Sequence, residues 1–309
     1  MSQARIIEVS EDYAGQRLDN FLLRELKGVP KTRLYKAFRK GEVRVNKGRV
    51  KGDYRLVAGD QVRIPPLRVA ERSAPTRVPA RWSALLEQNL LYEDSGLWVL
   101  NKPSGLAVHG GSGLKVGLIE CLRLLEPEAR YMELVHRLDR DTSGCIMVAR
   151  KAPVLKALHK LLREDKVDKR YLALVAGRWS PRRRFVEAPL QKNTLKSGER
   201  MVRVDREGKT ARTEFSVVER FDDATLIEAK PITGRTHQIR VHAQHAGHPI
   251  LGDEKYGDRD ANRWAAGQGL QRLFLHAASL KLSLPDSGRL SVSAPLDRNL
   301  EILLEKLRK

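Results

Sequence analysis

The sequence is poor in cysteine, in acidic residues relative to basic ones, and in long apolar runs. Its 309 residues hold two cysteines, Cys121 and Cys145, which excludes a disulfide scaffold and a zinc finger whose ligands are all cysteines. No stretch reaches the roughly 18 uninterrupted apolar residues of a membrane span, and the first residues lack the apolar core of a secretory signal. We therefore expect a reduced, soluble protein of the cytoplasm.

The shortage of acids leaves the chain strongly positive. Its 58 Lys and Arg residues outnumber 38 Asp and Glu residues, for a formal net charge of +20. Such a balance favours a polyanionic partner. Hydrophobic residues make up 41% of the chain, which is enough for a sizeable core, and the length is typical of about two domains.

Residues 1–70 form the first expected domain, a small basic module. They hold 16 Lys or Arg against 8 Asp or Glu. Apolar residues at helical spacing predict one helix over 18–26 and another around 34–38, with short strands after them. We expect the cations around the second helix to bind RNA: Lys31, Arg33, Lys36, Arg39 and Lys40. The alternative is a solvated helix face, but the single sign of the charge favours RNA.

The stretch that begins with Pro65-Pro66 and includes Pro75 and Pro79 has little periodicity. It predicts a linker over 71–89, with a short helix from Trp82 that docks on the second domain. Over 90–309, strands and helices mix without regular alternation, which predicts an α+β fold with a largely antiparallel mixed sheet. Expected strands lie at 96–100, 145–149, 171–175 and 226–229. Expected helices lie at 116–125, from Pro153 onward, from Thr236 to about Gly247, and at 297–308.

The densest polar segment is His136-Arg-Leu-Asp-Arg-Asp-Thr-Ser-Gly144, which stands between apolar Leu134-Val135 and an expected strand. A loop with four charges and two hydroxyls between buried elements is costly unless its groups satisfy one another or meet a ligand. Loops held by a rigid scaffold often carry catalytic groups. The alternative is a purely structural loop of ion pairs.

A second polar segment, Gly234-Arg-Thr-His-Gln-Ile-Arg240, comes after the proline-broken end of a strand. It lies at an expected helix N-terminus, where anions are favoured. Arg235 is placed to meet a carboxylate of the first loop and to hold it ionised. A phosphate contact is the alternative role for Arg235.

Two other signals are discounted. Four histidines, His237, His242, His245 and His248, lie within 12 residues, but no cysteine or glutamate stands nearby at a ligand spacing, so we expect no metal and instead histidines at the surface or facing RNA. Ser143 and His136 lack the glycine pattern that surrounds the serine of a nucleophile elbow.

The ordered motifs resemble the RluA-type pseudouridine synthases, in particular the RluC subgroup that modifies large-subunit ribosomal RNA. The resemblance runs from about residue 10 to the C-terminus. Residues 17–64 resemble an S4 RNA-binding module. Four segments resemble the successive motifs of the catalytic domain. They are Asn101-Lys-Pro-Ser-Gly105, the polar segment 136–144, Lys169-Arg-Tyr-Leu-Ala-Leu-Val175 and the polar segment 234–240. Gly252-Asp-Glu-Lys-Tyr-Gly257 also fits.

The resemblance implies a reaction and roles for particular residues. The N1–C1′ bond of a uridine in 23S RNA breaks, the uracil rotates, and C5 joins C1′, without cofactor or metal. The implied catalytic residues are Asp139 as the carboxylate, Tyr171 as a residue that stacks on the base or takes a proton, and Arg235 as the basic partner of Asp139. Arg137 is implied to fill the gap left by the extruded base.

Leu138 and Ile232 are candidate walls of the base pocket. A single carboxylate suits isomerisation better than hydrolysis, which needs a second group to activate water. Two other readings stay open, a ribosome-associated RNA-binding protein without turnover and a glycosidase that releases uracil. The expected partner is 23S RNA or the assembling large subunit, and we expect a monomer with no membrane contact.

Overall fold

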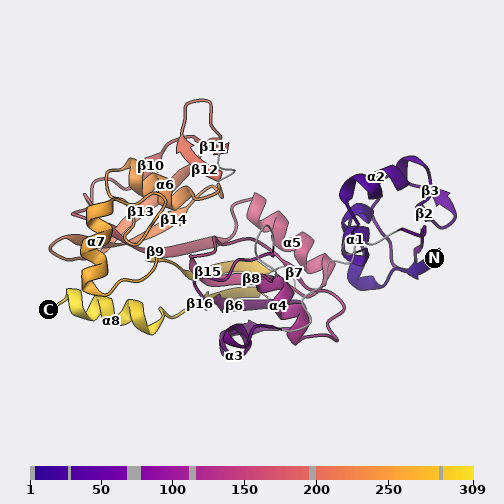
Figure 1. Cartoon of the computed structure of the whole chain (residues 1–309), viewed down its shortest axis with the longest axis horizontal. Coiled ribbons are helices and arrows are strands. Elements are labelled where there is room, and N and C mark those ends of the chain that lie inside the picture. The colour runs from indigo at the N-terminus through magenta and orange to yellow at the C-terminus, as the bar shows by residue number, and fades with distance from the viewer. Residues whose placement is uncertain (1–3, 27–28, 68–77, 111–115, 195–199, 285–287) are drawn as a thin grey trace.

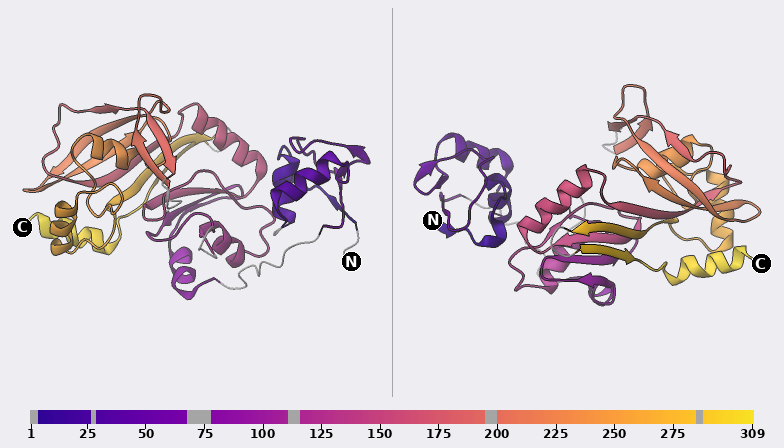
Figure 2. Two further views of the ribbon diagram at one scale, coloured as in Figure 1. Left: turned by 45° about the horizontal axis from the view of Figure 1, so that its top comes forward. Right: turned by 180° about the vertical axis from the view of Figure 1, so that it is seen from behind.

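The structure is a computed structural model that describes residues 4–26, 29–67, 78–110, 116–194, 200–284 and 288–309. Figure 1 and the two views of Figure 2 show a small N-terminal unit beside a larger body built around one extended sheet. Within these ranges, no helix has the length and apolar character needed to cross a membrane.

The N-terminal unit contains both helices that the apolar spacing predicts. Its described elements are β1 (Arg5–Glu8), the 3-10 helix η1 (Glu11–Tyr13), α1 (Leu18–Glu25), α2 (Lys31–Arg39), β2 (Arg44–Val45), β3 (Gly48–Arg49) and β4 (Gln61–Ile64). The strands pair in the order β1-β4-β2-β3, all antiparallel. Leu18, Leu22 and Leu34 are fully buried in the shared core, so the cations of α2 lie on its outer face.

The larger body is an α+β domain on a mostly antiparallel sheet, as predicted. Its strands have the order β10-β13-β14-β9-β15-β8-β6-β5, with β16 on β15 and β7 on β8. Their bounds are β5 (Leu90–Glu93), β6 (Leu97–Lys102), β7 (Glu133–Leu134), β8 (Ser143–Ala149), β9 (Asp168–Ala176), β10 (Phe185–Glu187), β13 (Arg212–Arg220), β14 (Ala224–Pro231), β15 (Leu275–Leu284) and β16 (Gly288–Ser293). A separate hairpin joins β11 (Leu190–Thr194) to β12 (Arg200–Val204).

The two halves of the sheet meet at β8 and β15, the one parallel pair among the described strands. Gly144 stands opposite Ala277 in this pair, and its φ is 106°. A Cβ added at Gly144 would lie 2.3 Å from the Ala277 carbonyl oxygen. Only glycine allows this approach, so the last residue of the nine-residue polar segment is explained by packing.

Helices cover the sheet at α3 (Ala80–Gln88), α4 (Leu118–Leu125), α5 (Ala152–Arg163), α6 (Gln238–His245), α7 (Arg259–Gln268) and α8 (Arg298–Leu307). The helices predicted over 116–125, from Pro153 and over 297–308 are confirmed by α4, α5 and α8. The docking helix predicted within the linker is α3, whose Leu86 is buried in one core with Leu122 and Leu158. Residues 68–77, which include the first part of the predicted linker at 71–89, lie outside the described residues.

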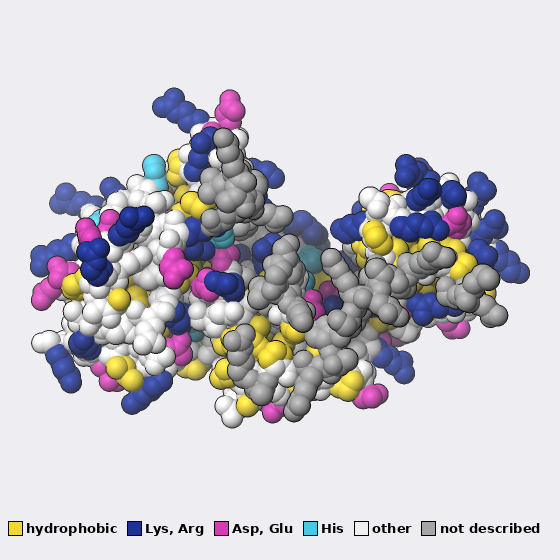
Figure 3. Space-filling model, in the orientation of Figure 1, with side chains coloured by type: hydrophobic (Ala, Val, Ile, Leu, Met, Phe, Trp, Pro, Cys, Tyr) yellow, Lys and Arg dark blue, Asp and Glu magenta, His cyan; other side chains and the backbone are white. Residues whose placement is uncertain are grey.

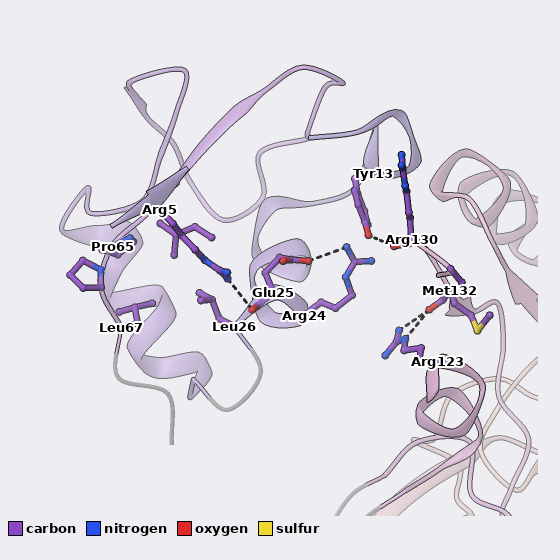
Figure 4. A pocket seen from close by; sticks show the side chains of 13 residues that line it. Arg5, Tyr13, Arg24, Glu25, Leu26, Pro65, Leu67, Arg123, Arg130 and Met132 are labelled. Atoms are coloured by element: carbon purple, nitrogen blue, oxygen red, sulfur yellow. Dashed lines mark hydrogen bonds and ion pairs between the residues drawn. The ribbon is translucent and has the colours of Figure 1, made fainter. Parts of the chain in front are cut away.

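A cavity of about 700 Å³ marks the place where the N-terminal unit meets the larger body (Figure 4). The ring of Tyr13 lies 5.6 Å from that of Tyr131, and its hydroxyl donates to the Arg130 carbonyl. The Arg24 guanidinium lies 4.0 Å from the centre of the Tyr13 ring, a favourable cation–π distance. These contacts orient the basic unit on the body that carries the polar loop.

Candidate active site

The polar loop that comes after β7 is held in place by hydrogen bonds from the residues that come after β6. The backbone N–H of Gly105 donates to the Arg140 carbonyl at 2.9 Å, and the Ser104 hydroxyl donates to the Asp141 carbonyl at 2.8 Å. Two motif segments far apart in the sequence therefore build one rigid loop. Such support is what holds a catalytic group within a narrow range of positions.

Lys102 is the central residue of this support. Its motif, Asn101–Gly105, is visible in the sequence, but its role is not. It is 0% exposed, and its ammonium donates to the carbonyls of Pro103 and Leu106 at 2.8 Å and of Arg140 at 3.0 Å. Burial lowers its pKa to about 7. Three carbonyl acceptors match the three donors of an ammonium, so Lys102 ties the loop of Asp139 to the sheet.

Asp139 lies at the top of this loop, with its side chain 21% exposed. Its Oδ2 accepts a hydrogen bond from Nη1 of Arg240 at 3.1 Å, and its Oδ1 lies 3.7 Å from Nε2 of His237. Arg240 is buried and binds Asp253 with two further hydrogen bonds, of 2.7 and 2.8 Å. The guanidinium thus lies between two carboxylates, and one of them, Asp139, keeps an edge open to the cavities.

The prediction that Arg235 pairs with Asp139 is wrong. Arg235 is exposed, and its Nε donates to the Thr210 carbonyl at 3.0 Å, whereas Arg240 makes the ion pair with the carboxylate. The position at which α6 begins explains why Arg240, and not Arg235, reaches Asp139. The predicted cap at Thr236 is also wrong, because the helix begins at Gln238, which places Arg240 on its first turn.

His237 makes this turn possible. It precedes α6 with a φ of 54°, a left-handed conformation that is uncommon for a residue other than glycine. Its Nδ1 hydrogen-bonds the Tyr256 hydroxyl at 2.7 Å, which holds the ring beside Asp139. Burial lowers the pKa of His237 although the Asp139 charge opposes that shift. The imidazole beside Asp139 is therefore neutral at neutral pH, and the cation that binds Oδ2 of Asp139 is Arg240.

Burial disfavours the charged form of Arg240. The carboxylates of Asp253 and Asp139 outweigh this effect and raise the pKa of Arg240. The pKa of Asp253 is lowered, because hydrogen bonds from Arg240 outweigh the effect of burial. Asp253 also accepts the backbone N–H groups of Lys255 and Tyr256. Its oxygens are therefore fully engaged, and Asp253 is a positioning residue for Arg240.

Two cavities meet at Asp139. The smaller, about 330 Å³, is lined by Leu138, Tyr171, Pro231 and Leu275 among others, and the larger, about 880 Å³, extends toward His109 and Arg272. Both are lined by Arg137, Leu138, Asp139, His237 and Arg240. Leu138 is thus a wall of the smaller cavity as expected. Ile232 is not, since it lines a neighbouring cavity that shares Pro231 with the smaller one.

Tyr171 stands on β9 opposite Ala229 and Ala277, and it lines the smaller cavity with Asp139. Desolvation by the surrounding protein, together with the Asp139 charge, raises the pKa of its phenol. The hydroxyl is therefore protonated at neutral pH. No described hydrogen bond uses it, which leaves it available to a ligand in the cavity.

His242 and Ser143 have structural partners, whereas His245 is exposed as predicted. His242 is fully buried between the Thr213 hydroxyl and the Ala188 carbonyl, so its predicted place at the surface or on RNA was wrong. Ser143 is buried and bonds His276 at 2.8 Å. Among the described residues, no group of His, Cys, Asp and Glu is arranged to hold a metal ion.

Comparison with known proteins agrees with this architecture. A family model for RNA pseudouridylate synthase matches residues 96–245, and one for the S4 domain matches residues 16–62. Ribosomal large subunit pseudouridine synthase C of Escherichia coli K12 is 57% identical over 308 residues, which cover 98% of this chain and 97% of that protein. The chain belongs to the RNA pseudouridylate synthase family. The protein of the same name in Haemophilus influenzae is 54% identical and covers 100% of this chain and 96% of its own length.

A solved member of the family supports the fold. The structure of human RNA pseudouridylate synthase domain containing 4 aligns with a TM-score of 0.61 at 29% identity, and the match covers 74% of this chain and 96% of that one. Pseudouridylate synthases are isomerases, so the enzyme class predicted from the sequence is confirmed, as is the S4 domain at the N-terminus.

The five cations predicted to bind RNA lie on or directly after α2 in the S4 domain. Figure 3 shows that Lys and Arg side chains cover much of the visible face of this unit. Arg33 and Lys40 both lie near Glu42, at 3.3 and 3.9 Å, so part of their charge is balanced. Lys31, Lys36 and Arg39 are exposed and have no carboxylate partner among the described residues. These three are the stronger candidates for phosphate contacts.

Proposed function

We propose that the protein converts specific uridines of 23S ribosomal RNA to pseudouridine. The relatives at 54–57% identity carry the name ribosomal large subunit pseudouridine synthase C over nearly the whole chain, and the basic S4 domain suits an RNA substrate. The observation that carries the proposal is an open carboxylate, Asp139, held by Arg240 at the edge of a cavity lined by Tyr171.

Asp139 acts as the catalytic carboxylate. Cleavage of the N1–C1′ bond develops positive charge on the ribose, which an ionised carboxylate stabilises, or attacks at C1′. The alternative, assistance in removing the C2′ proton, also needs the ionised form. The Arg240 guanidinium donates to Oδ2 of the carboxylate and fixes its direction, so Arg240 takes the role that the sequence suggested for Arg235.

The carboxylate that shares Arg240 with Asp139 is not available for hydrolysis. A glycosidase needs a second carboxyl group to activate water, and the neighbouring Asp253 is buried and engaged by Arg240 and two backbone N–H groups. Asp253 is therefore not free to serve as that second group. A uracil held in the smaller cavity can rotate and rejoin the ribose.

Tyr171 stacks on the uracil and takes part in the last proton transfer. When C5 has joined C1′, the proton on C5 must leave. A neutral phenol accepts that proton only as it passes its own proton on, and the Asp139 carboxylate, free again at this stage, is the acceptor. Asp139 releases this proton to water, and N1, which no longer bonds C1′, takes up a proton from water. The net change is one proton lost from C5 and one gained at N1, and the enzyme returns to its first state.

Arg137 completes the site. It is exposed and lines both cavities, so its planar guanidinium is placed to enter the space that an extruded uridine leaves in the RNA. The substrate is 23S RNA, free or in the assembling subunit, and the protein would then work in the cytoplasm. We keep residues 1–70 and 90–309 as the proposed RNA-binding and catalytic domains.

Incubation with unmodified 23S RNA tests the proposal. Isomerisation leaves the RNA mass unchanged and creates nucleotides that react with carbodiimide. A glycosidase would release free uracil, and a binding protein would change nothing. Asp139→Asn should lose turnover and keep RNA binding, whereas the matched control Asp141→Asn should keep both, because Asp141 pairs with the exposed Arg140 at the surface. Turnover by Asp139→Asn would reject the role of the carboxylate.

A further inference from the structure

A second candidate RNA site lies in the S4 domain, around an exposed aromatic ring that the cation pattern does not explain. Tyr35 stands in the middle of α2 and is 43% exposed. It lines a cavity of about 1010 Å³ that also includes Phe38, Val50 and Gly52. An aromatic ring left open in a hollow of this size is a surface to which a flat ligand can bind.

The ring is held in one orientation. Its hydroxyl donates to Oδ2 of Asp19 at 2.7 Å, and Asp19, 3% exposed, is itself fixed by two hydrogen bonds from Arg17 at 3.1 and 2.7 Å. Phe38 packs against Tyr35 at a ring-centre distance of 6.0 Å. Little side-chain freedom remains to be lost on binding, which favours affinity.

The charge around the ring identifies the kind of ligand. Lys31, Arg39, Arg49 and Lys51 line the same cavity, all four are exposed, and none has a carboxylate partner among the described residues. Asp53 is the one acid among the described residues that line the cavity. A ring with cations on its rim is the arrangement that binds single-stranded nucleic acid, by stacking on a base and neutralising its phosphates.

We propose that this groove binds an unpaired nucleotide of the substrate RNA, with its base stacked on Tyr35 and its flanking phosphates near Arg39 and Arg49. The inference rests on the proposed function and deepens it, because it predicts that the S4 domain recognises a single-stranded or bulged segment as well as backbone charge. A paired base does not offer its face to Tyr35, so a duplex gains nothing from the ring.

Binding of the full-length protein to two RNA probes tests the inference. The probes are a fluorescent 12-nucleotide single strand and a 12-base-pair duplex that contains the same strand. Tyr35→Ala should weaken binding of the single strand about tenfold, equal to about 1.4 kcal/mol, and change duplex binding less than twofold. Tyr35→Phe keeps the ring and should retain most of the affinity. Val57→Ala, an exposed apolar residue outside the groove, is the matched control.

The salt dependence separates stacking from charge. Tyr35→Ala should leave the slope of log affinity against log salt unchanged, whereas Arg49→Ala should lower it by about 0.7, the value for one phosphate of a single strand. Circular dichroism checks that each variant is folded. Equal affinity of Tyr35→Ala and the wild type for the single strand would overturn the inference. An equal loss of affinity for the single strand and the duplex would also overturn it. Neither result would bear on isomerisation of 23S RNA, which is measured separately.

Discussion

Arg240 and Arg235 stand five residues apart in one motif, and the structure predicts opposite consequences for their loss. Arg240→Met removes a buried guanidinium that makes three hydrogen bonds to two carboxylates. Removal of one partner from a buried ion pair costs about 3–5 kcal/mol. Two backbone N–H groups still bind Asp253, so we expect the lower end, about 3 kcal/mol.

For a domain of this size, a loss of that magnitude lowers the Tm by about 6–12 °C. Arg235→Met removes one exposed hydrogen bond and should change stability by less than about 0.5 kcal/mol. Turnover should fall about 100-fold or more in Arg240→Met, because Asp139 loses the group that fixes it, and remain near the wild-type rate in Arg235→Met.

The pH dependence of stability adds a second readout. The folded-state pKa of Asp253 is lowered, so the stability it contributes is present above the unfolded pKa of about 4 and is lost as the pH falls through the folded value. Without Arg240 that lowering shrinks, and the acid limb of the stability curve should become flatter. Thermal unfolding of both variants between pH 3 and pH 7, beside single-turnover rates, is the assay. A larger effect of Arg235→Met on either quantity would refute the assignment of roles.

Three further predictions concern separate parts of the molecule. Tyr171→Phe keeps the ring and removes the hydroxyl, so turnover should fall about 100-fold while RNA affinity stays within twofold; an unchanged rate would remove the proton-transfer role. A protein without residues 1–70 should bind 23S RNA more weakly and with a shallower salt dependence, and an identical slope would show that this domain does not contact phosphates. Gly144→Ala places a methyl group against the Ala277 carbonyl and should destabilise the fold by at least about 2 kcal/mol in denaturant unfolding; wild-type stability would show that the β8–β15 junction can yield.

The sequence predicts the local elements of this fold well and the contacts between distant segments poorly. The leucine spacing and Pro153 are enough for α5, because periodicity and a proline in the first turn are local signals. The parallel pairing of β8 with β15 joins segments that are distant in the chain, His276 with Ser143 and Ala277 with Gly144, and no local pattern reports it. The family resemblance supplied the candidate site, whereas composition alone indicated only a polyanionic partner.

The misplaced arginine shows where sequence reasoning ends. Both arginines belong to one motif, and the choice between them depends on the left-handed turn at His237, which a contact with Tyr256 stabilises from 19 residues away. Lys102 was overlooked for a similar reason. A lysine side chain is ordinarily solvated, and the burial of Lys102 at the end of β6 depends on the Arg140 carbonyl, which another motif provides.

The loss of hydrogen from C5 of uridine tests the central claim most directly, because the C5–H bond breaks only if C5 joins C1′. With 23S RNA labelled with tritium at C5, the wild-type protein should release tritium to water at specific uridines. Asp139→Asn should release none at RNA concentrations where its binding equals that of the wild type. Tritium release by Asp139→Asn at the wild-type rate would contradict the account.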